Sequence, residues 1–446
     1  MSSASKDNGV RVAVVNLGCD KNRVDSEVMS GLLEEAGFQL TSEQDAEVII
    51  VNTCAFILDA KKESVETLLE LAGYKDHGSC RLILAAGCLA QRYADELLRE
   101  MPELDGVIGT GGVGSIVESV RRAANGERVR EVGPPGFLSP RVLPRVLSGA
   151  PYTAYLKIAE GCDNRCAYCV IPDLRGPHRS RQPSQLFREA EQLVAGGVRE
   201  LILVAQDTTR YGSDLGDGTN LASLVSRLAD LDGLKWLRLL YCHPAGITRE
   251  LVEALAREPK VCRYLDIPMQ HASDTVLRRM GRKVCRDDLF KLVDFLRRST
   301  PGLVIRSTFM VGFPGETEAE FEELLSFLRE VRLDRAGFFA YSREEGTAAA
   351  RMPGQVPEEL KQERLARAAA LQREISLLRN RARVGSEVTV LVEGRRGEDY
   401  FGRTEGDAPD IDGYVFFQSA LELAPGDFIQ VRITRAGSYD LWGEIT

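Results

Sequence analysis

The chain repeatedly alternates short apolar runs with longer stretches of helical periodicity, and this pattern constrains its fold more than any other feature. In residues 153–342, six runs rich in branched and aromatic side chains are separated by such stretches. Six βα units in a row predict a buried parallel sheet, either open and doubly wound or curved into a partial barrel. The expected strands are 154–159, 200–206, 236–242, 264–270, 303–313 and 336–342, and the expected helices include 184–195, 248–257, 286–299 and 317–331.

A shorter alternation of the same kind precedes it. The spacing of roughly 35 residues would also suit a helical solenoid, but the β-branched runs favour strands. We therefore predict an N-terminal open parallel βαβ domain over residues 11–125. Its expected strands are 11–17, 47–52 and 81–86, and its expected helices are 23–36, 59–72 and 91–100.

The remaining segments differ in pattern. Closely spaced prolines predict a linker at 126–150, and the central domain, 151–382, ends in a long amphipathic helix at 357–382. Residues 383–446 show short alternating strands with Gly-rich turns, which predict a small all-β barrel. The polar residues 1–10 predict a disordered tail, so the chain as a whole is an α/β protein of three folded parts.

Composition limits the class of protein. The 446 residues are 44% hydrophobic and 28% charged, and no run of 18 apolar residues or secretory signal is present. We therefore expect a cytoplasmic protein without a membrane partner. Thiols stay reduced in that compartment, so the ten cysteines favour metal binding or catalysis over disulfides.

Three of these cysteines lie within eight residues, in the stretch GCDNRCAYC. Cys162, Cys166 and Cys169 have the spacing C-x3-C-x2-C and follow the first central strand. A zinc ion would need a fourth ligand, for which His178 is the nearest candidate, and structural zinc motifs usually pair C-x2-C units. Three unrelated thiols are a further alternative. An iron–sulfur cubane with three cysteine-bound irons and one open iron fits the spacing best.

A second set of three cysteines is dispersed along the N-terminal domain. Cys19, Cys54 and Cys88 each come directly after an expected parallel strand, in the stretches VNLGC, VNTC and AAGC. The carboxyl ends of parallel strands share one edge of a sheet, so we expect these cysteines to meet in space. Each alone could be a buried thiol, but three at equivalent positions predict a second three-coordinate cluster.

The cysteine motif after strand one of a six-unit βα domain resembles the radical S-adenosylmethionine (SAM) superfamily. Together with the second triad and the terminal barrel, it resembles the methylthiotransferase family over essentially the whole chain past residue 10. The resemblance implies two [4Fe–4S] clusters, one of which binds SAM at its open iron, and a terminal TRAM domain that docks the substrate. It implies that SAM serves both as methyl donor and as radical source, that the second cluster supplies the sulfur, and that an external electron donor is needed.

Several stretches resemble the RimO-like branch, which modifies the β-carbon of an aspartate in the twelfth small-subunit ribosomal protein. They are AQDTTRYG (205–212), PMQHASD (268–274) and GRTEGDAPDIDG (402–413). Residues 381–446 also carry seven Lys or Arg against twelve Asp or Glu, which suits a basic protein partner better than RNA phosphates. Nucleic acid is therefore not expected as the primary substrate, and a MiaB-like modification of tRNA adenosine is the alternative.

The resemblance also implies SAM-contacting residues near the strand ends. An aromatic ring beside the adenine would be Tyr168, with packing as the alternative, and Thr317 could simply cap a helix after an ordinary βα turn. Arg175, Arg179 and Arg181 could steer anionic groups, although a solvated basic face is the commoner explanation. The candidate cofactor-binding residues are Tyr168, Gln206, Asp207, Gln270, Arg306, Gly312 and Phe313.

Two other classes of function compete with a transferase. A two-cluster electron-transfer protein would usually saturate its clusters with four cysteines, which the two triads do not provide. An RNA-binding module built on the terminal barrel would show salt-dependent affinity for tRNA. Neither the catalytic side chains nor the target aspartate can be assigned from the residues alone.

Overall fold

The N-terminal part is a six-stranded parallel sheet in the order β2-β1-β3-β4-β5-β6. The structure is a computed structural model that describes residues 9–446, so most of the expected disordered tail, 1–10, lies outside the described residues. The sheet runs through β1 (Arg11–Asn16), β2 (Gln39–Leu40), β3 (Val48–Thr53), β4 (Leu82–Gly87), β5 (Gly106–Ile108) and β6 (Val129–Glu131).

Helices cover both faces of this sheet. One apolar cluster joins it to α1 and α5, and another joins it to α2 and α4, so the strands are buried from both sides. This two-sided burial explains why the strands are continuous apolar runs rather than alternating ones. The helices are α1 (Asp20–Glu35), α2 (Leu58–Ala72), α3 (Tyr74–His77), α4 (Cys88–Glu100) and α5 (Ile116–Ala124).

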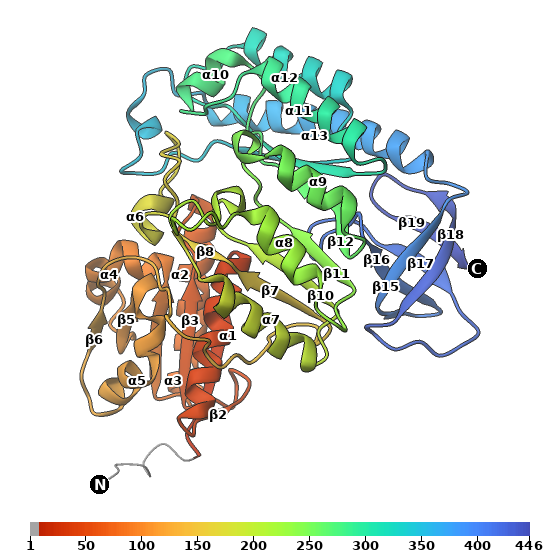
Figure 1. Cartoon of the computed structure of the whole chain (residues 1–446). Coiled ribbons are helices and arrows are strands. Elements are labelled where there is room, and N and C mark those ends of the chain that lie inside the picture. Colours follow the sequence, from red (N-terminus) through yellow and green to blue (C-terminus); the bar gives the residue numbers. More distant parts are fainter. Residues whose placement is uncertain (1–8) are drawn as a thin grey trace.

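The central part is a second six-stranded parallel sheet, in the sequential order β14-β13-β12-β11-β10-β7. It is open, and it curves into a partial barrel with its helices on the outside (Figure 1). The strands are β7 (Thr153–Lys157), β10 (Glu200–Val204), β11 (Trp236–Leu239), β12 (Val261–Asp266), β13 (Val304–Val311) and β14 (Arg335–Ala340), with a small antiparallel pair β8 (Ala159–Glu160) and β9 (Arg179–Ser180).

The main hydrophobic core lies between the central sheet and its outer helices. At the start of α12, Thr317 caps the helix by accepting a hydrogen bond from the backbone N–H of Glu320, as the alternative interpretation of that turn expects. The central helices are α6 (Ile171–Arg175), α7 (Pro183–Ala195), α8 (Leu221–Ala229), α9 (Arg249–Arg257), α10 (Asp274–Arg279), α11 (Arg286–Ser299), α12 (Glu318–Val331) and α13 (Glu358–Arg381).

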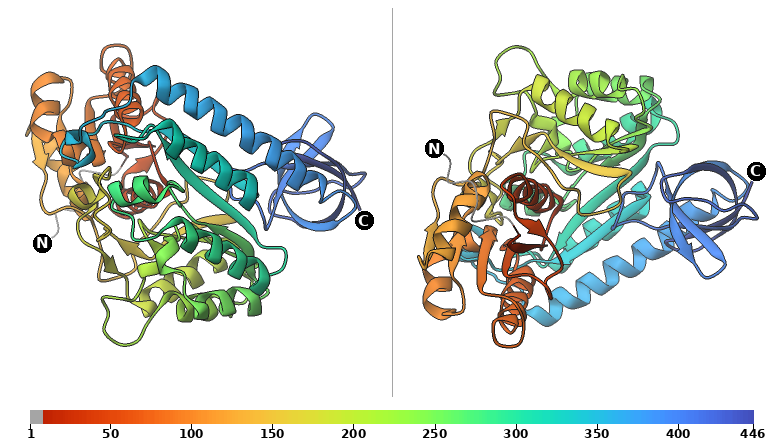
Figure 2. Two further views of the ribbon diagram at one scale, coloured as in Figure 1. Left: turned by 90° about the horizontal axis from the view of Figure 1, so that it is seen from above. Right: turned by 90° about the horizontal axis from the view of Figure 1, so that it is seen from below.

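The C-terminal part is a closed five-stranded barrel, β15-β16-β17-β19-β18, to which α13 leads (Figure 2). Its strands are β15 (Glu387–Arg396), β16 (Asp399–Thr404), β17 (Val415–Gln418), β18 (Phe428–Ala436) and β19 (Leu441–Ile445). The α/β class, the partial barrel and the terminal all-β barrel are thus confirmed, and the solenoid alternative is wrong.

Buried polar contacts hold the barrel against the central sheet. The fully buried carboxylate of Glu200 lies 2.6 Å from Arg403 of the barrel and 2.8 Å from Arg238 of β11. Asp412, in the loop after β16, accepts a hydrogen bond of 2.7 Å from the hydroxyl of Tyr264. These groups are satisfied only while the barrel stays docked, so the contact has a defined geometry.

Three details of the strand pattern differ from expectation. The segment 126–150 contains β6, which pairs with β5 at the edge of the N-terminal sheet, so it is not wholly a linker. The short strands β2 and β5 were also missed, because two or three residues give no readable period. The strand expected at 264–270 starts at Val261 and ends two residues before Pro268, which cannot donate to a ladder.

A candidate site at two cysteine triads

The first triad lies on a tightly held loop between β8 and α6. The N–H of Cys162 donates to the carbonyl of Gly176 at 3.1 Å, and the N–H of Cys169 donates to the carbonyl of Cys166 at 3.0 Å. The N–H of Ala167 donates to the carbonyl of Met280 at 2.9 Å, which connects the loop to the end of α10. The loop therefore presents its three thiols from a backbone whose position is fixed on both sides.

The second triad forms where the sequence predicts it, at the carboxyl edge of the N-terminal sheet. Cys19 follows β1, Cys54 follows β3 and Cys88 follows β4, and these strands are neighbours in the sheet. The chain order reverses between β1 and β3, and such switch points are the usual ligand sites of open α/β sheets.

Glycines allow this second triad to close. A Cβ atom on Gly18 would lie 2.8 Å from the Cβ of Cys54, and one on Gly87 would lie 2.2 Å from the Oδ1 of Asn52. Both glycines also have a positive φ, of 89° and 87°. A side chain at either position would push a strand end away from its neighbour.

Burial keeps most of these thiols protonated when no metal is present. It raises the pKa of Cys162 to about 11, and the pKa values of Cys54 and Cys169 to about 12. The pKa of Cys88 is raised as well, although Arg175 opposes the effect of burial. Metals bind the thiolate, so occupation of either triad would release protons.

A buried arginine lies close to each triad. Arg282, 8% exposed, has its Nη1 3.9 Å from the Sγ of Cys166. Arg175, 2% exposed, donates to the Oδ1 of Asn22, and that oxygen is 3.8 Å from the Sγ of Cys88. These positive charges lower the cost of holding thiolates or an anionic cluster out of water.

Arg175 belongs to a buried ionic network that crosses between the two domains. Its Nη1 lies 2.6 Å from Asp25 of α1, and Lys157 of β7 is paired with both Asp25 and Glu160. Glu160 in turn accepts a hydrogen bond of 2.8 Å from Gln206. The explanation of Arg175 as part of a solvated basic face is therefore wrong, because the N-terminal domain covers it.

The second triad and the carboxyl end of the central sheet face one another. The hydroxyl of Tyr241, just past β11, donates to the Oδ2 of Asp20 at 2.8 Å, directly beside Cys19. The ammonium of Lys21 lies 3.3 Å from the centre of the Tyr241 ring. Tyr241 and Gln270 have left-handed φ angles of 61° and 74°. Such strain at strand ends is typical of functional sites.

Three of the predicted SAM contacts lie at this edge. Gln206 and Gln270 each leave a buried Oε1 without a hydrogen-bond partner. The carboxylate of Asp207 accepts a hydrogen bond of 2.6 Å from the side chain of Asn164, which helps to fix the loop that carries the first triad. Buried unpaired oxygens are costly, so two of them beside the cysteine triads fit a site that completes its hydrogen bonds with a ligand.

The other residues predicted to contact SAM lie against other parts of the protein. Phe313 is fully buried and packs edge-to-face with Tyr168 at 6.4 Å, so packing accounts for both rings. A Cβ on Gly312 would lie 2.3 Å from Lys361 of α13, so α13 makes the close approach there. Arg306 is paired with Asp266 at 2.8 Å. Direct SAM contacts by these four residues stay predictions.

The donor chemistry fits clusters better than a single ion. His178 contacts Ser180 at 3.2 Å and Asp214 at 3.7 Å, so its Nε2 is engaged outside the triad. Within residues 9–446 no three His, Cys, Asp or Glu side chains are placed to hold one metal ion. In a cubane each cysteine binds a different iron, so the thiols stand further apart than the ligands of a single ion. This arrangement suits each set of three thiols.

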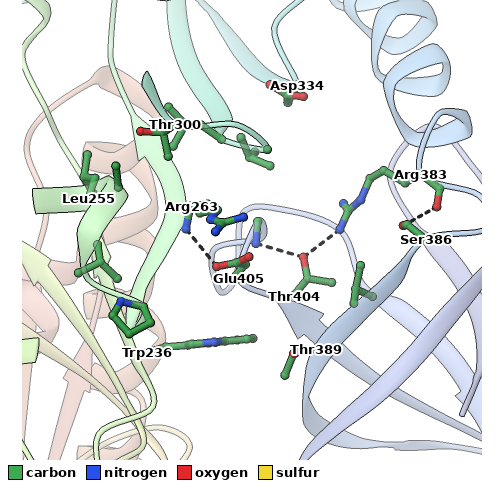
Figure 3. Close-up of a pocket in the computed structure, with 18 of the residues that line it drawn as sticks. Trp236, Leu255, Arg263, Thr300, Asp334, Arg383, Ser386, Thr389, Thr404 and Glu405 are labelled. Atoms are coloured by element: carbon green, nitrogen blue, oxygen red, sulfur yellow. Dashed lines mark hydrogen bonds between the residues drawn. The ribbon is translucent and has the colours of Figure 1, made fainter. Parts of the chain in front are cut away.

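One large cavity lies away from the two triads. It has a volume of about 1050 Å³ and opens between the amino ends of the central strands and the barrel (Figure 3). Glu405 accepts from the N–H of Arg263 at 3.2 Å, and Arg383 donates to Thr404 at 3.2 Å across its floor. None of the cysteines and none of the predicted cofactor residues line it.

Comparison with known proteins identifies the family. Three family models match: Uncharacterized protein family UPF0004 over residues 11–109, the Radical SAM superfamily over 156–328 and the TRAM domain over 384–446. The protein named ribosomal protein uS12 methylthiotransferase RimO from Desulforudis audaxviator is 70% identical, with 99% of this chain and 98% of that protein covered. The chain belongs to the RimO family. The RimO of Pelotomaculum thermopropionicum is 56% identical over 98% of this chain and 99% of that one.

Solved structures resemble this RimO-family chain in fold. The radical SAM methyltransferase TsrM from Kitasatospora setae superposes with a TM-score of 0.55 at 17% identity, covering 76% of this chain and 77% of that one. At this identity the likeness shows the fold alone. The expected relationship to RimO-like radical SAM methylthiotransferases is confirmed by the sequence relatives.

Sequence reasoning missed several residues that the structure places beside the triads. They are Lys21, Asn22, Tyr241 and Arg282. Lys21 and Asn22 could have been found, because they follow Cys19 in the first turn of a helix whose start faces the site. Tyr241 and Arg282 carried no local signal, since only the tertiary fold brings them to the cysteines.

Proposed function

We propose that this chain transfers a methylthio group to the β-carbon of an aspartate side chain in ribosomal protein uS12. The observation that carries this is full-length similarity to RimO proteins, at up to 70% identity among those compared. The two triads, which lie at facing edges of the two sheets, support it. The reaction needs one site for radical generation and another for sulfur.

Family membership brings SAM and [4Fe–4S] clusters as cofactors. We assign one cluster to Cys162, Cys166 and Cys169, and the second to Cys19, Cys54 and Cys88. When bound, these groups supply the radical, methyl and sulfur chemistry. The proposal also includes an external electron donor for the clusters.

The protein's own residues hold and shield these groups. Arg175 and Arg282 place positive charge beside the thiols, and Tyr241 braces the start of α1 through Asp20. Gln206 and Gln270 offer unpaired oxygens at the strand ends, where an amino group could be bound. Burial of the ionic network around Glu160 excludes water between the two domains.

The terminal barrel docks the substrate in this proposal. Two of the acidic side chains counted toward steering, Asp407 and Asp412, are buried against the central domain. They therefore fix the barrel rather than attract a partner. The exposed residues Glu398 and Glu422 stay available for steering uS12.

The test is anaerobic reconstitution with iron, sulfide, SAM, a reductant and intact small ribosomal subunits. Peptide mass spectrometry should find a methylthio group on an aspartate of uS12. Modified tRNA adenosine with untouched uS12 would favour the MiaB-like alternative instead. Failure of the reduced protein to cleave SAM would favour an electron-transfer protein. Within residues 9–446 no helix has the length and apolarity that a membrane span needs. Because the proposed substrate is a ribosomal protein, we propose the cytoplasm as the site of action.

A further inference from the structure

Lys21 is a buried cation without a counter-ion. It is only 6% exposed, and its ammonium forms no ion pair or hydrogen bond with any residue of the described chain. Within residues 9–446 the ammonium makes a cation–π contact with the Tyr241 ring, whose centre is 3.3 Å away. A buried ammonium without hydrogen-bond partners is costly, so this arrangement calls for an anion that the protein does not itself provide.

Neighbouring carboxylates are already committed to other groups. Asp20 accepts a hydrogen bond from the Tyr241 hydroxyl at 2.8 Å, and Asp266 accepts one from the Tyr241 N–H at 3.1 Å. Asp266 is also paired with Arg306 at 2.8 Å. Tyr241 therefore engages both acids, and neither is paired with Lys21 in the described part of the chain.

The start of α1 strengthens the attraction for an anion. Its N-cap, Cys19, makes no side-chain capping bond, so no side chain satisfies the first N–H groups of this 16-residue helix. These N–H groups and the helix dipole add to the charge of Lys21. Lys21 is 6% exposed rather than fully enclosed, so its side chain keeps an accessible edge.

We propose that the Lys21 ammonium binds the carboxylate of the substrate aspartate and so selects that side chain. This inference rests on the proposed function and deepens it. The β-carbon of aspartate is bonded directly to its carboxylate carbon, so a held carboxylate places the reacting carbon one bond away. Lys21 lies two residues from Cys19, which puts that carbon beside the triad assigned to sulfur.

The test compares binding of two proteins by the full chain with both clusters reconstituted, without reductant so that no turnover occurs. One is uS12, and the other is uS12 with the modified aspartate replaced by asparagine. The unaltered chain should prefer the aspartate form by about 10-fold or more. Lys21→Gln should lose this preference, and Lys21→Arg should retain most of it. Lys62→Gln, at an exposed lysine of α2, is the matched control and should keep the full preference.

Three results would overturn the proposal. Lys21→Gln that still prefers aspartate would show that another group reads the carboxylate. A fall in SAM affinity with the aspartate preference intact would assign the ammonium to the carboxylate of SAM. Loss of iron from both Lys21→Gln and Lys21→Arg would assign Lys21 to the triad itself. If the unaltered chain neither binds nor modifies uS12, the proposed function itself fails. That result comes from the unaltered chain alone, so it is distinct from a failure of the Lys21 proposal.

Discussion

The guanidinium of Arg175 lies 2.6 Å from the carboxylate of Asp25, and this contact joins the two cysteine triads. Arg175 ends the helix that follows the first triad, and Asp25 lies on the helix that starts at Cys19. Because both side chains are nearly fully buried, neither can find water as a substitute partner. Breaking this pair is therefore expected to weaken the contact between the two halves of the site.

Arg175→Met should destabilise the protein by about 3–5 kcal/mol, because it leaves the buried carboxylates of Asp25 and Glu160 sharing the ammonium of Lys157. It should also reduce the iron bound at Cys19, Cys54 and Cys88. Urea unfolding and iron analysis check this. Arg188→Met, at an exposed residue of α7, is the control and should change the free energy of unfolding by less than about 0.5 kcal/mol. Equal stability of both variants would contradict the role of the network.

The two triads should lose their clusters separately. Cys162→Ala should abolish SAM cleavage, because it removes a ligand from the cluster assigned to SAM, while the N-terminal cluster remains. Cys88→Ala should remove the N-terminal cluster and leave SAM cleavage measurable. Iron content and electron paramagnetic resonance of each variant distinguish the clusters. SAM cleavage by Cys162→Ala would show that this assignment is wrong.

Gly87→Ala should prevent assembly of the N-terminal cluster. The new Cβ would lie 2.2 Å from the Oδ1 of Asn52 and 2.8 Å from the carbonyl of Thr53, so β3 and β4 would have to separate beside Cys88. Gly126→Ala is a matched control, because its φ of 85° is also positive but nothing lies within 4 Å of the new atom. It should cost only about 1–2 kcal/mol from backbone strain. Normal iron binding by Gly87→Ala would count against the tight closure of the triad.

Docking of the barrel should weaken in acid through Glu200. Burial alone would raise the pKa of this carboxyl, but Arg403 and Arg238 outweigh burial and hold it at about 2, below the ordinary 4.5. A depressed pKa gives stability that is complete above about pH 4.5 and is lost as the pH falls toward about 2. The loss should amount to about 3 kcal/mol in the free energy of unfolding.

Urea unfolding of the intact chain between pH 7 and pH 2 measures this effect. Glu200→Gln should be less stable at pH 7, because two buried arginines lose their carboxylate, and its stability should vary less across the acid range. Glu191→Gln, at an exposed residue of α7, should follow the unaltered chain. A parallel acid response of Glu200→Gln and the unaltered chain would exclude Glu200 as the titrating group.

The six cysteines and the strands that carry them could be predicted from local pattern. Each of Cys19, Cys54 and Cys88 follows an apolar run, and parallel topology then brings their positions to one edge. The SAM contacts were harder to predict. Gly312 and Phe313 lie against α13 and Tyr168, and their contact with SAM stays a prediction. Long-range packing brings these neighbours together, and the turn itself carries no sign of them.

The sequence by itself determined the three folded parts, the family and the two sets of three thiols, because hydrophobic period and short motif spacing are local properties of the chain. Only the tertiary structure decided which charges meet at the site. Arg175 pairs with a residue 150 positions away, and Lys21 reaches Tyr241 without meeting any carboxylate. Electrostatic contacts depend on distance and burial in space, so they cannot be read from residue order alone.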